Sequence, residues 1–227
     1  MIRTKKEKRE RLAAIIEALK QLYPDAPCAL EYEGDPWRLL VMARLSAQCT
    51  DKRVNIVSRE LFKKYPDPTS LALASISEVE DIVRPCGLYK MKAQSIVDAS
   101  HMLITKFGGE LPQDMDSLLQ LPGVGRKIAN LLIGDIFGGG AIVCDTHFMR
   151  ICGRLGMYKE GLKDAGRVEF IMRDLMDISE GSDFCHRRVI FGREICTARA
   201  PLCHSCPIRE LCEKGRPRAS SASGGGE

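Results

Sequence analysis

The amino-acid sequence of 227 residues predicts an all-α protein. Apolar residues recur at intervals of three and four along most of the chain, which is the period of a helix with one buried face. Asp or Ser stands directly before several of these segments, as the N-cap of a helix does. Runs of alternating apolar and polar residues joined by short turns, which indicate β-hairpins, are absent from the sequence. We therefore expect about ten helices joined by short connections.

The expected helices follow one another in order along the chain. The first should bury a stripe of apolar residues: Leu12, Ile15, Ile16, Leu19 and Leu22. Asp35 and Pro36 mark the start of the second, because Asp is a preferred N-cap and proline fits the first helical position. Asp51 should cap the third, and Ser77 with Glu80 has the spacing of a capping box for a later one. Further helices are expected over 90–107, 116–120, 126–137, 145–156, 164–177 and 183–195.

Charge and hydropathy argue against a protein with a diffuse basic surface and against a membrane-spanning protein. The chain has 34 Lys+Arg and 30 Asp+Glu, and its net charge of +4 equals the charge of residues 1–11 alone, so a diffuse basic surface is excluded. The longest apolar stretch, 128–144, is interrupted by Asn130, Asp135 and the glycines 138–140, so we expect no membrane span. The N-terminal segment also lacks the unbroken apolar core of a secretory signal. These features predict a cytoplasmic protein whose ten cysteines do not form disulfides.

A glycine-rich turn joins two expected helices within 118–132, LLQLPGVGRKIANLL. Gly123 and Gly125 permit positive φ angles and leave no side chain between the backbone and a ligand. The first amides of the second helix, with the positive end of its dipole, would suit a phosphate group. A plain helical hairpin explains the same pattern. A Walker loop is excluded because no Gly-Lys-Ser/Thr follows.

Four cysteines near the C-terminus have the spacing C-x6-C-x2-C-x5-C: Cys196, Cys203, Cys206 and Cys212. Four thiolates in one loop can hold an iron–sulfur cluster or a tetrahedral zinc ion. Zinc sites more often present two close pairs of cysteines, and only Cys203 and Cys206 form one here. The spacing therefore favours a [4Fe-4S] cluster over zinc. The other six cysteines share no ligand spacing, and most of them are expected to be small buried hydrophobic residues.

Several motifs in the same order resemble the endonuclease III family of DNA glycosylases. They are LSAQCTD at 45–51, GLY at 87–89, LPGVGRKIAN at 121–130, DTH at 145–147 and the four C-terminal cysteines. The likeness runs from Trp37 to Cys212. It implies two helical domains flanking a DNA-binding cleft. One is a six-helix barrel over 29–139 with a helix–hairpin–helix; the other, an iron–sulfur cluster domain, combines 1–28 with 140–215. A disordered tail is expected over 216–227.

The resemblance also implies an activity. Such an enzyme removes oxidised pyrimidines from DNA and cleaves the abasic site by β-elimination through a lysine Schiff base. Lys127 stands where the family carries its nucleophile, and Asp145 stands where it carries a carboxylate that stabilises positive charge at the sugar. A lysine attacks only as the neutral amine, and we expect the start of a helix and the neighbouring Arg126 to disfavour its charged form. The residues alone also fit a phosphate-contacting Lys127 and an Asp145 that only caps a helix.

DNA contacts are implied at five further positions: Gln48, Leu88, Gly123, Gly125 and Arg126. Repair of a base inside duplex DNA requires the nucleotide to be flipped out of the stack. By the resemblance, Gln48 would enter the vacated space and Leu88 would wedge into the opposite strand. The residues alone leave a surface amide and a core leucine as alternatives. We expect His147 to be structural.

The resulting expectation is a monomeric enzyme with a [4Fe-4S] cluster that acts on double-stranded DNA containing damaged bases or abasic sites, in a bacterial-type cytoplasm beside the nucleoid. An adenine-mismatch glycosylase of the same superfamily is one alternative, and it would not need Lys127. A non-catalytic DNA-binding or redox iron–sulfur protein is another, and it would have no use for Lys127 and Asp145 together. Cys49, Cys144 and the three glycines at 138–140 depart from the family pattern, which leaves the range of lesions open.

Overall fold

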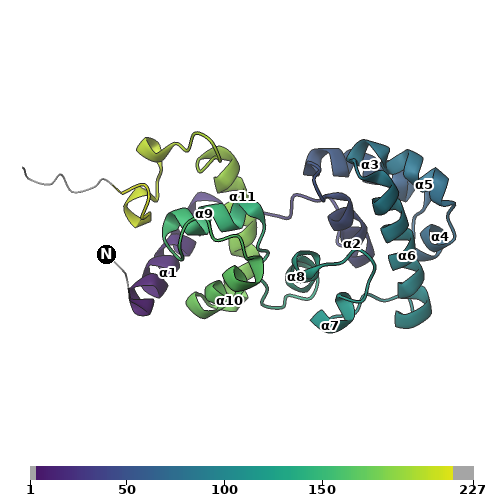
Figure 1. Cartoon of the computed structure of the whole chain (residues 1–227), viewed down its shortest axis with the longest axis horizontal. Coiled ribbons are helices and arrows are strands. Elements are labelled where there is room, and N and C mark those ends of the chain that lie inside the picture. The colour runs from purple at the N-terminus through teal and green to yellow at the C-terminus, as the bar shows by residue number, and fades with distance from the viewer. Residues whose placement is uncertain (1–3, 217–227) are drawn as a thin grey trace, which may run out of the picture. The chain divides into compact units, whose positions relative to one another are not determined.

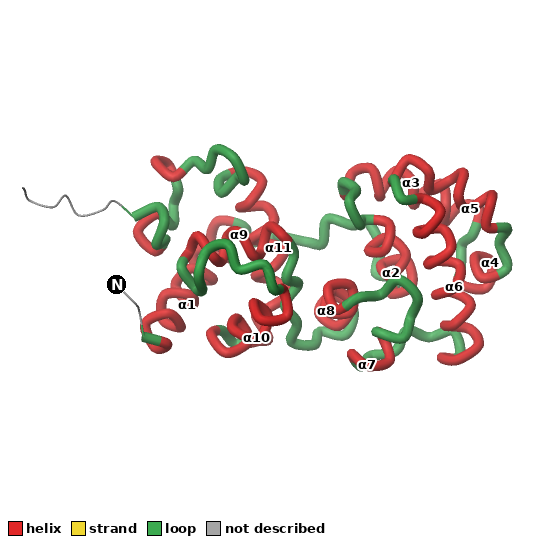
Figure 2. Tube along the Cα trace, in the orientation of Figure 1, coloured by secondary structure: helices red, strands yellow, loops and turns green. Residues whose placement is uncertain are grey.

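The computed structural model describes residues 4–216, and this part of the chain contains helices and loops but no strand (Figures 1 and 2). The predicted all-α fold class is therefore confirmed. The α-helices are α1 Lys5–Leu22, α2 Pro36–Leu45, α3 Asp51–Lys64, α4 Pro68–Ala72, α5 Ile76–Val83, α6 Tyr89–Phe107, α7 Met115–Leu118, α8 Arg126–Asp135, α9 Thr146–Leu155, α10 Ala165–Leu175 and α11 Gly181–Glu194. Short 3-10 helices are η1 Arg84–Cys86, η2 Ile178–Glu180, η3 Cys203–Ser205 and η4 Arg209–Leu211. The tail predicted over 216–227 lies, apart from Arg216, outside the described residues.

The described chain forms two compact units. The hairpin unit contains Pro27–Val143 and Asp177–His186. The cysteine unit contains Cys144–Met176 and the described residues of Met1–Ala26 and Arg187–Glu227. Among the described residues, no helix is both long and apolar enough to cross a membrane.

Helix α2 forms the centre of the hairpin unit. Nearly all of its side chains are buried, which is the pattern of a helix surrounded by others rather than one lying on a surface. It contacts α3, α6 and α8. Its Trp37 is buried, and the indole Nε1 donates a hydrogen bond of 3.0 Å to Ser100 Oγ on α6. Helix α8, which follows the glycine turn, therefore packs directly against this central helix.

Helix α1 supplies much of the apolar face of the cysteine unit, and it contacts α10 and η4 (Figure 1). Four residues of the predicted stripe are buried: Leu12, Ile15, Ile16 and Leu19. Leu22 is 40% exposed, so the prediction is wrong at this position. It is the last residue of the helix, beyond the part that the rest of the unit covers.

Two predicted helix starts are wrong in detail. Thr50, not Asp51, caps α3, because the backbone of Thr50 is still extended and its Oγ1 accepts from the amide of Arg53. Asp51 is the first helical residue. The predicted capping box of Ser77 and Glu80 is not formed, because α5 already begins after Ser75.

Other sequence signals are confirmed by the structure. Asp35 caps α2 and accepts a hydrogen bond of 3.0 Å from the amide of Arg38. The helices predicted between 90 and 195 are all present, and their ends differ from the predicted ends by at most two residues. Helix α4 was not predicted, although Asp67 and Pro68 repeat the signal of Asp35 and Pro36. At five residues, its apolar pattern is too short to recognise.

Candidate active site and cysteine cluster

The glycine turn lies tightly against the core of the hairpin unit. Gly123 has a φ of 78°, and a Cβ there would come within 2.8 Å of Arg44 Cδ and Ser95 Cβ. Both the positive φ and the close approach therefore require glycine. Gly125 is different, because it has extended backbone (φ −101°, ψ 175°) and nothing lies within 4 Å of where its Cβ would be. Gly123 therefore uses the freedom to adopt a positive φ, whereas at Gly125 the missing side chain leaves space beside the start of α8.

Lys127 is the second residue of α8, directly after this open space. Its side chain is exposed, as is that of Arg126, while Ala129 and Leu132 on the same helix are buried. Gly125 provides no side-chain cap, so the first amides of α8 keep their hydrogens available for an acceptor. The start of α8 thus presents an amine next to backbone donors suited to an anion.

Asp145 is the N-cap of α9 in the cysteine unit. Its Oδ1 accepts two hydrogen bonds, one of 2.6 Å from the amide of Phe148 and one of 3.0 Å from Nη1 of Arg188. The Arg188 side chain is 1% exposed, and its guanidinium carbon lies 5.2 Å from the centre of the Phe148 ring. The Asp145 side chain is 19% exposed, so the carboxylate is anchored on one side and still reaches solvent.

No sequence motif points to Arg188. A lone arginine within a helix normally lies on the surface, and no spacing or motif marks this one as buried. Its Nε has no hydrogen-bond partner among the described residues. The guanidinium is held instead by the Asp145 carboxylate and by the ring of Phe148. Arg188 is therefore an additional residue of the candidate site.

His147 follows Asp145 and is half-buried. Burial lowers its pKa, and the cations of Arg150, Arg188 and Arg193 lower it further against the opposing effect of Asp145. Nδ1 of His147 lies 3.4 Å from Nη2 of Arg150. These contacts fit the expected structural role.

Gln48 and Leu88 both occupy unusual backbone conformations in the hairpin unit. Their φ angles are 54° and 50°, in the left-handed region that side chains other than glycine seldom adopt. Gln48 lies in the turn after α2, and Leu88 is the N-cap of α6. Both side chains are exposed, with Leu88 at 49%, so Leu88 is not a core leucine. Strained positions of this kind are concentrated at functional sites.

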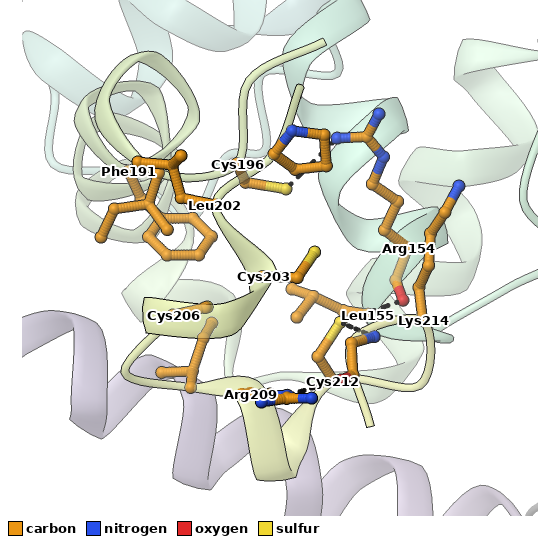
Figure 3. Close-up of a pocket in the computed structure, with 14 residues that line it drawn as sticks. Arg154, Leu155, Phe191, Cys196, Leu202, Cys203, Cys206, Arg209, Cys212 and Lys214 are labelled. Carbon is orange, nitrogen blue, oxygen red and sulfur yellow. Dashed lines mark hydrogen bonds between the residues drawn. The ribbon is translucent and has the colours of Figure 1, made fainter. Parts of the chain in front are cut away.

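The four C-terminal cysteines line one pocket of the cysteine unit (Figure 3). Cys196 follows α11, Cys203 begins η3, Cys206 follows η3 and Cys212 follows η4. All four are free thiols and partly buried. The pocket also has an apolar lining: Leu155, Phe191, Ile195, Pro201, Leu202 and Ile208. The fold therefore brings the four cysteines to a single pocket.

Arg154 fastens the first part of this loop. Its guanidinium donates to the carbonyls of Thr197 (2.7 Å) and Ala198 (2.8 Å) and lies 3.5 Å from Cys196 Sγ. At the other end of the loop, the amide of Gly215 donates to Cys212 Sγ across 3.3 Å. Hydrogen bonds to the sulfurs stabilise thiolate ligands and influence the potential of an iron–sulfur cluster.

The arrangement of the sulfurs can be compared with the geometry of a single zinc ion. Zinc binds sulfur at about 2.3 Å in a tetrahedron, which places the four sulfurs about 3.8 Å apart. Among the described residues, a group of three His, Cys, Asp or Glu side chains with ligand atoms within 4.8 Å of one another occurs only outside this pocket. No three of the four cysteine sulfurs are therefore mutually within 4.8 Å. As they stand, the sulfurs are therefore not gathered around one point as a single zinc ion requires.

Comparison with known proteins gives two family matches. Residues 41–177 match the HhH-GPD superfamily base excision DNA repair protein, and residues 196–212 match the iron-sulfur binding domain of endonuclease III. The endonuclease III of Synechocystis is 40% identical over 213 residues, covering 93% of this chain and 96% of the relative. The endonuclease III of Bacillus subtilis is 38% identical, covering 89% and 92%. A solved endonuclease III in a non-covalent complex with DNA has a TM-score of 0.86 and 39% identity, covering 94% of this chain and 97% of its own.

Proposed function

Because the chain belongs to the endonuclease III family within the HhH-GPD superfamily of base-excision DNA repair proteins, we propose that Lys127 is its nucleophile and Asp145 its catalytic carboxylate. The protein is a bifunctional DNA glycosylase and abasic-site lyase with an iron–sulfur binding domain. The observation that carries the assignment of Lys127 is its position, exposed in the first turn of a helix that no side chain caps.

The proposed reaction begins when the neutral Nζ of Lys127 attacks C1′ of the damaged nucleotide. The electrons of the glycosidic bond leave with the base, which takes up a proton. Opening of the sugar ring then gives a Schiff base between Nζ and C1′. Loss of a proton from C2′ drives electrons toward the iminium nitrogen and expels the 3′ phosphate, which is the β-elimination step. Water finally releases the lysine.

Asp145 would stabilise the positive charge that develops at the sugar and accept or return protons. Its hydrogen bonds with Phe148 and Arg188 support this role, because they fix the direction of the carboxylate before the substrate arrives. Arg188 would act through Asp145, as a positioning residue. A carboxylate that already serves as a cap needs no rearrangement to do this work.

The proposed partner is double-stranded DNA that contains damaged bases or abasic sites. The backbone at Gly123, Gly125 and Arg126 would contact phosphates at the start of α8, while Gln48 and Leu88 would fill the space left by the flipped nucleotide. Their exposed side chains on left-handed backbone support this assignment. We further propose that the enzyme acts as a monomer in a bacterial-type cytoplasm beside the nucleoid. The proposed barrel domain would correspond to the hairpin unit and the proposed cluster domain to the cysteine unit, with residues 27–28, 140–143 and 177–186 belonging to the hairpin unit rather than to the cluster domain.

A [4Fe-4S] cluster would be held by Cys196, Cys203, Cys206 and Cys212. When bound, it would supply metal–thiolate bonds that fix the loop after α11, and no step of the reaction passes through it. The shared pocket of the four cysteines, its apolar residues and the Gly215 amide directed at Cys212 support this set of ligands.

The substrate class is tested with three duplexes, which contain an oxidised thymine, adenine opposite 8-oxoguanine, or only normal bases. We expect the first duplex alone to be cleaved, leaving an unsaturated aldehyde at the 3′ end of the fragment that lies 5′ to the break. Excision of adenine, or an intact abasic strand as the end product, would contradict the proposed lyase mechanism and favour the mismatch enzyme.

A further inference from the structure

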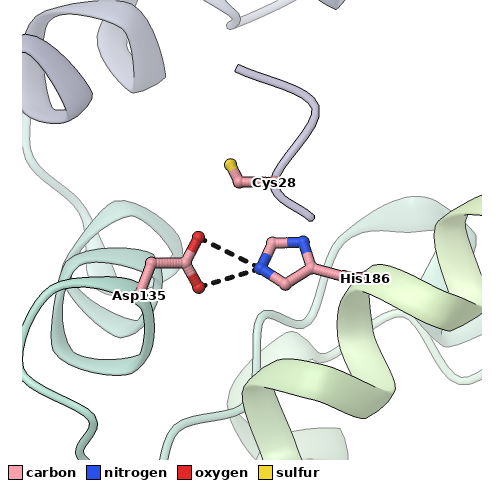
Figure 4. A group of neighbouring side chains, drawn as sticks. All are labelled: Cys28, Asp135 and His186. Carbon is pink, nitrogen blue, oxygen red and sulfur yellow. Dashed lines mark hydrogen bonds and ion pairs between the residues drawn. The ribbon is translucent and has the colours of Figure 1, made fainter. Parts of the chain in front are cut away.

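Three side chains that no local motif connects meet within the hairpin unit (Figure 4). Cys28 lies in the loop between α1 and α2, Asp135 is the last residue of α8, and His186 lies in the first half of α11. One ligand atom from each side chain lies within 4.8 Å of the other two. Cys28 is one of the six cysteines without ligand spacing in the sequence, and its neighbours are a carboxylate and an imidazole.

The carboxylate and the imidazole are already aligned. Nε2 of His186 lies 2.9 Å from Oδ1 and 3.0 Å from Oδ2 of Asp135. The side chains are 5% exposed for Asp135 and 16% for His186. Ser182 Oγ donates a hydrogen bond of 2.6 Å to Asp135 Oδ1 and so helps to fix the orientation of the carboxylate. The group is therefore partly shielded from water and fixed by a hydrogen bond from outside it.

Glycines allow these elements to approach so closely. A Cβ on Gly134 would come within 2.8 Å of Ser182 Oγ, and a Cβ on Gly140 would come within 2.7 Å of Ile178. Residues 177–186 can therefore lie directly on the end of α8 and the loop after it. This packing explains why glycine stands at position 140, within the run that departs from the family pattern.

We propose that Cys28, Asp135 and His186 form a Zn²⁺ site. Zinc takes sulfur, imidazole nitrogen and carboxylate oxygen together, at about 2.0–2.3 Å, so its ligand atoms lie about 3.3–3.8 Å apart. Nε2 of His186 and Oδ1 of Asp135 are 2.9 Å apart and all three ligand atoms lie within 4.8 Å of one another, so small side-chain movements would bring them to these separations. Water would complete the tetrahedron, and Ser182 would orient the carboxylate as an outer partner of the kind common at zinc sites.

The charges of such a site balance. A thiolate, a carboxylate and a neutral imidazole carry two negative charges, which one Zn²⁺ neutralises. Binding displaces the proton of the Cys28 thiol and any proton on Nε2 of His186 and releases both to solvent. No electron transfer is involved. Without a metal, the same residues form a His–Asp pair beside a thiol, which is the alternative that the experiment must separate.

The zinc ion would act as a structural clamp. It would join the loop at Cys28, the end of α8 and residues 177–186. Asp135 and Lys127 lie eight positions apart on α8, which corresponds to about 12 Å along the helix axis. The clamp is thus separate from the proposed nucleophile but holds the far end of the helix that carries it.

The test uses the full-length, iron-loaded protein, stripped of adventitious metal with a chelator that leaves its iron content unchanged. After incubation with Zn²⁺ and gel filtration, we expect about one zinc per chain by elemental analysis, and a higher melting temperature. Cys28→Ala and His186→Ala should lose the zinc, and Ser182→Ala should weaken its binding about tenfold. His101→Ala, at an exposed histidine of α6, is the matched control and should keep it.

Zinc binding by Cys28→Ala and His186→Ala at the wild-type level would overturn the proposal. If these variants fail to fold, the wild-type protein decides the question. A zinc content near zero, together with a melting temperature that Zn²⁺ does not raise, would show that the three residues form only a hydrogen-bonded cluster.

Discussion

Arg188 donates a hydrogen bond of 3.0 Å to Oδ1 of Asp145, the same oxygen that accepts the Phe148 amide at the start of α9. One carboxylate oxygen therefore caps a helix and neutralises a buried cation. The two partners are not equally dependent on this contact, since Arg188 is 1% exposed and Asp145 is 19% exposed. Loss of the carboxylate leaves a charge in the interior, whereas loss of the arginine leaves a charge that reaches water.

The first prediction follows from this asymmetry. Asp145→Asn should lower the free energy of unfolding by about 3 kcal/mol, because Arg188 stays buried without a counter-ion, even though Asn is as good an N-cap as Asp. Arg188→Met should have a smaller effect, about 1 kcal/mol, because the remaining carboxylate is partly solvated. Chemical denaturation of the three proteins measures both values. A larger loss for Arg188→Met than for Asp145→Asn would contradict this account of the pair.

The second prediction concerns Leu88, whose side chain is half-exposed on left-handed backbone. Leu88→Gly should change the free energy of unfolding by less than about 1 kcal/mol, because the relief of backbone strain offsets the loss of partial burial. Excision of a damaged base from duplex DNA should slow about tenfold or more, because the side chain that we propose as the wedge offsetting the loss of base stacking is gone. Cleavage of an abasic site in a single strand should be unchanged.

Leu73 provides the matched control, since it is an exposed leucine at the end of α4, at 82% exposure. Leu73→Ala should leave excision unchanged, whereas Leu88→Ala should slow it. Equal rates for the two variants, or a loss of more than about 3 kcal/mol of stability in Leu88→Gly, would assign Leu88 to packing instead of DNA contact.

The third prediction concerns removal of the cluster. Cys203→Ser should abolish the yellow-brown colour of the purified protein and most of its iron, because the pocket loses one of four thiolates. Its melting temperature should fall by about 10 °C, the shift that about 3 kcal/mol produces in a chain of this size. Cys144→Ser, outside the pocket, should retain both colour and iron. A colourless wild-type protein loaded with zinc at these cysteines would contradict the assignment of a cluster.

The fourth prediction is a pH dependence that arises from His147. Burial, followed by the effects of Arg150, Arg188 and Arg193 against that of Asp145, lowers its pKa in the folded protein. The unfolded chain therefore binds a proton near pH 6.5 that the folded protein takes up only at lower pH. Stability should fall as the pH decreases below about 6.5 and be restored when the pH rises again. Between about pH 7.5 and pH 5.5, the melting temperature should fall less for His147→Gln than for the wild-type protein. Thermal unfolding at the two pH values measures this difference.

Periodicity and capping residues predicted most of the fold, because each helix has to bury one apolar face and satisfy its first amides locally. The predicted start of a helix was less exact where two preferred N-cap residues are adjacent. Thr50 and Asp51 are both preferred N-caps, and only the backbone angles show that Thr50 has this role. The cysteine loop was recognisable because its ligands lie close together in sequence.

The remaining features of the site depend on contacts between distant parts of the chain. Asp145 and Arg188 lie more than forty residues apart, and so no local pattern reveals the buried arginine. Cys28, Asp135 and His186 come from three segments that the fold brings together. The left-handed backbone at Gln48 and Leu88 is also not predictable from residue type, because neither residue favours that conformation.

The central claim, that Lys127 forms the covalent intermediate, is tested most directly by borohydride trapping on a duplex that contains an oxidised pyrimidine. Borohydride reduces a Schiff base to a stable amine, so the wild-type protein should become crosslinked to the DNA strand. The control Lys106→Gln, at an exposed lysine of α6, should give the same adduct. Lys127→Gln should fold, because its side chain is exposed, and should give no adduct. An adduct with Lys127→Gln at the wild-type yield would contradict the account.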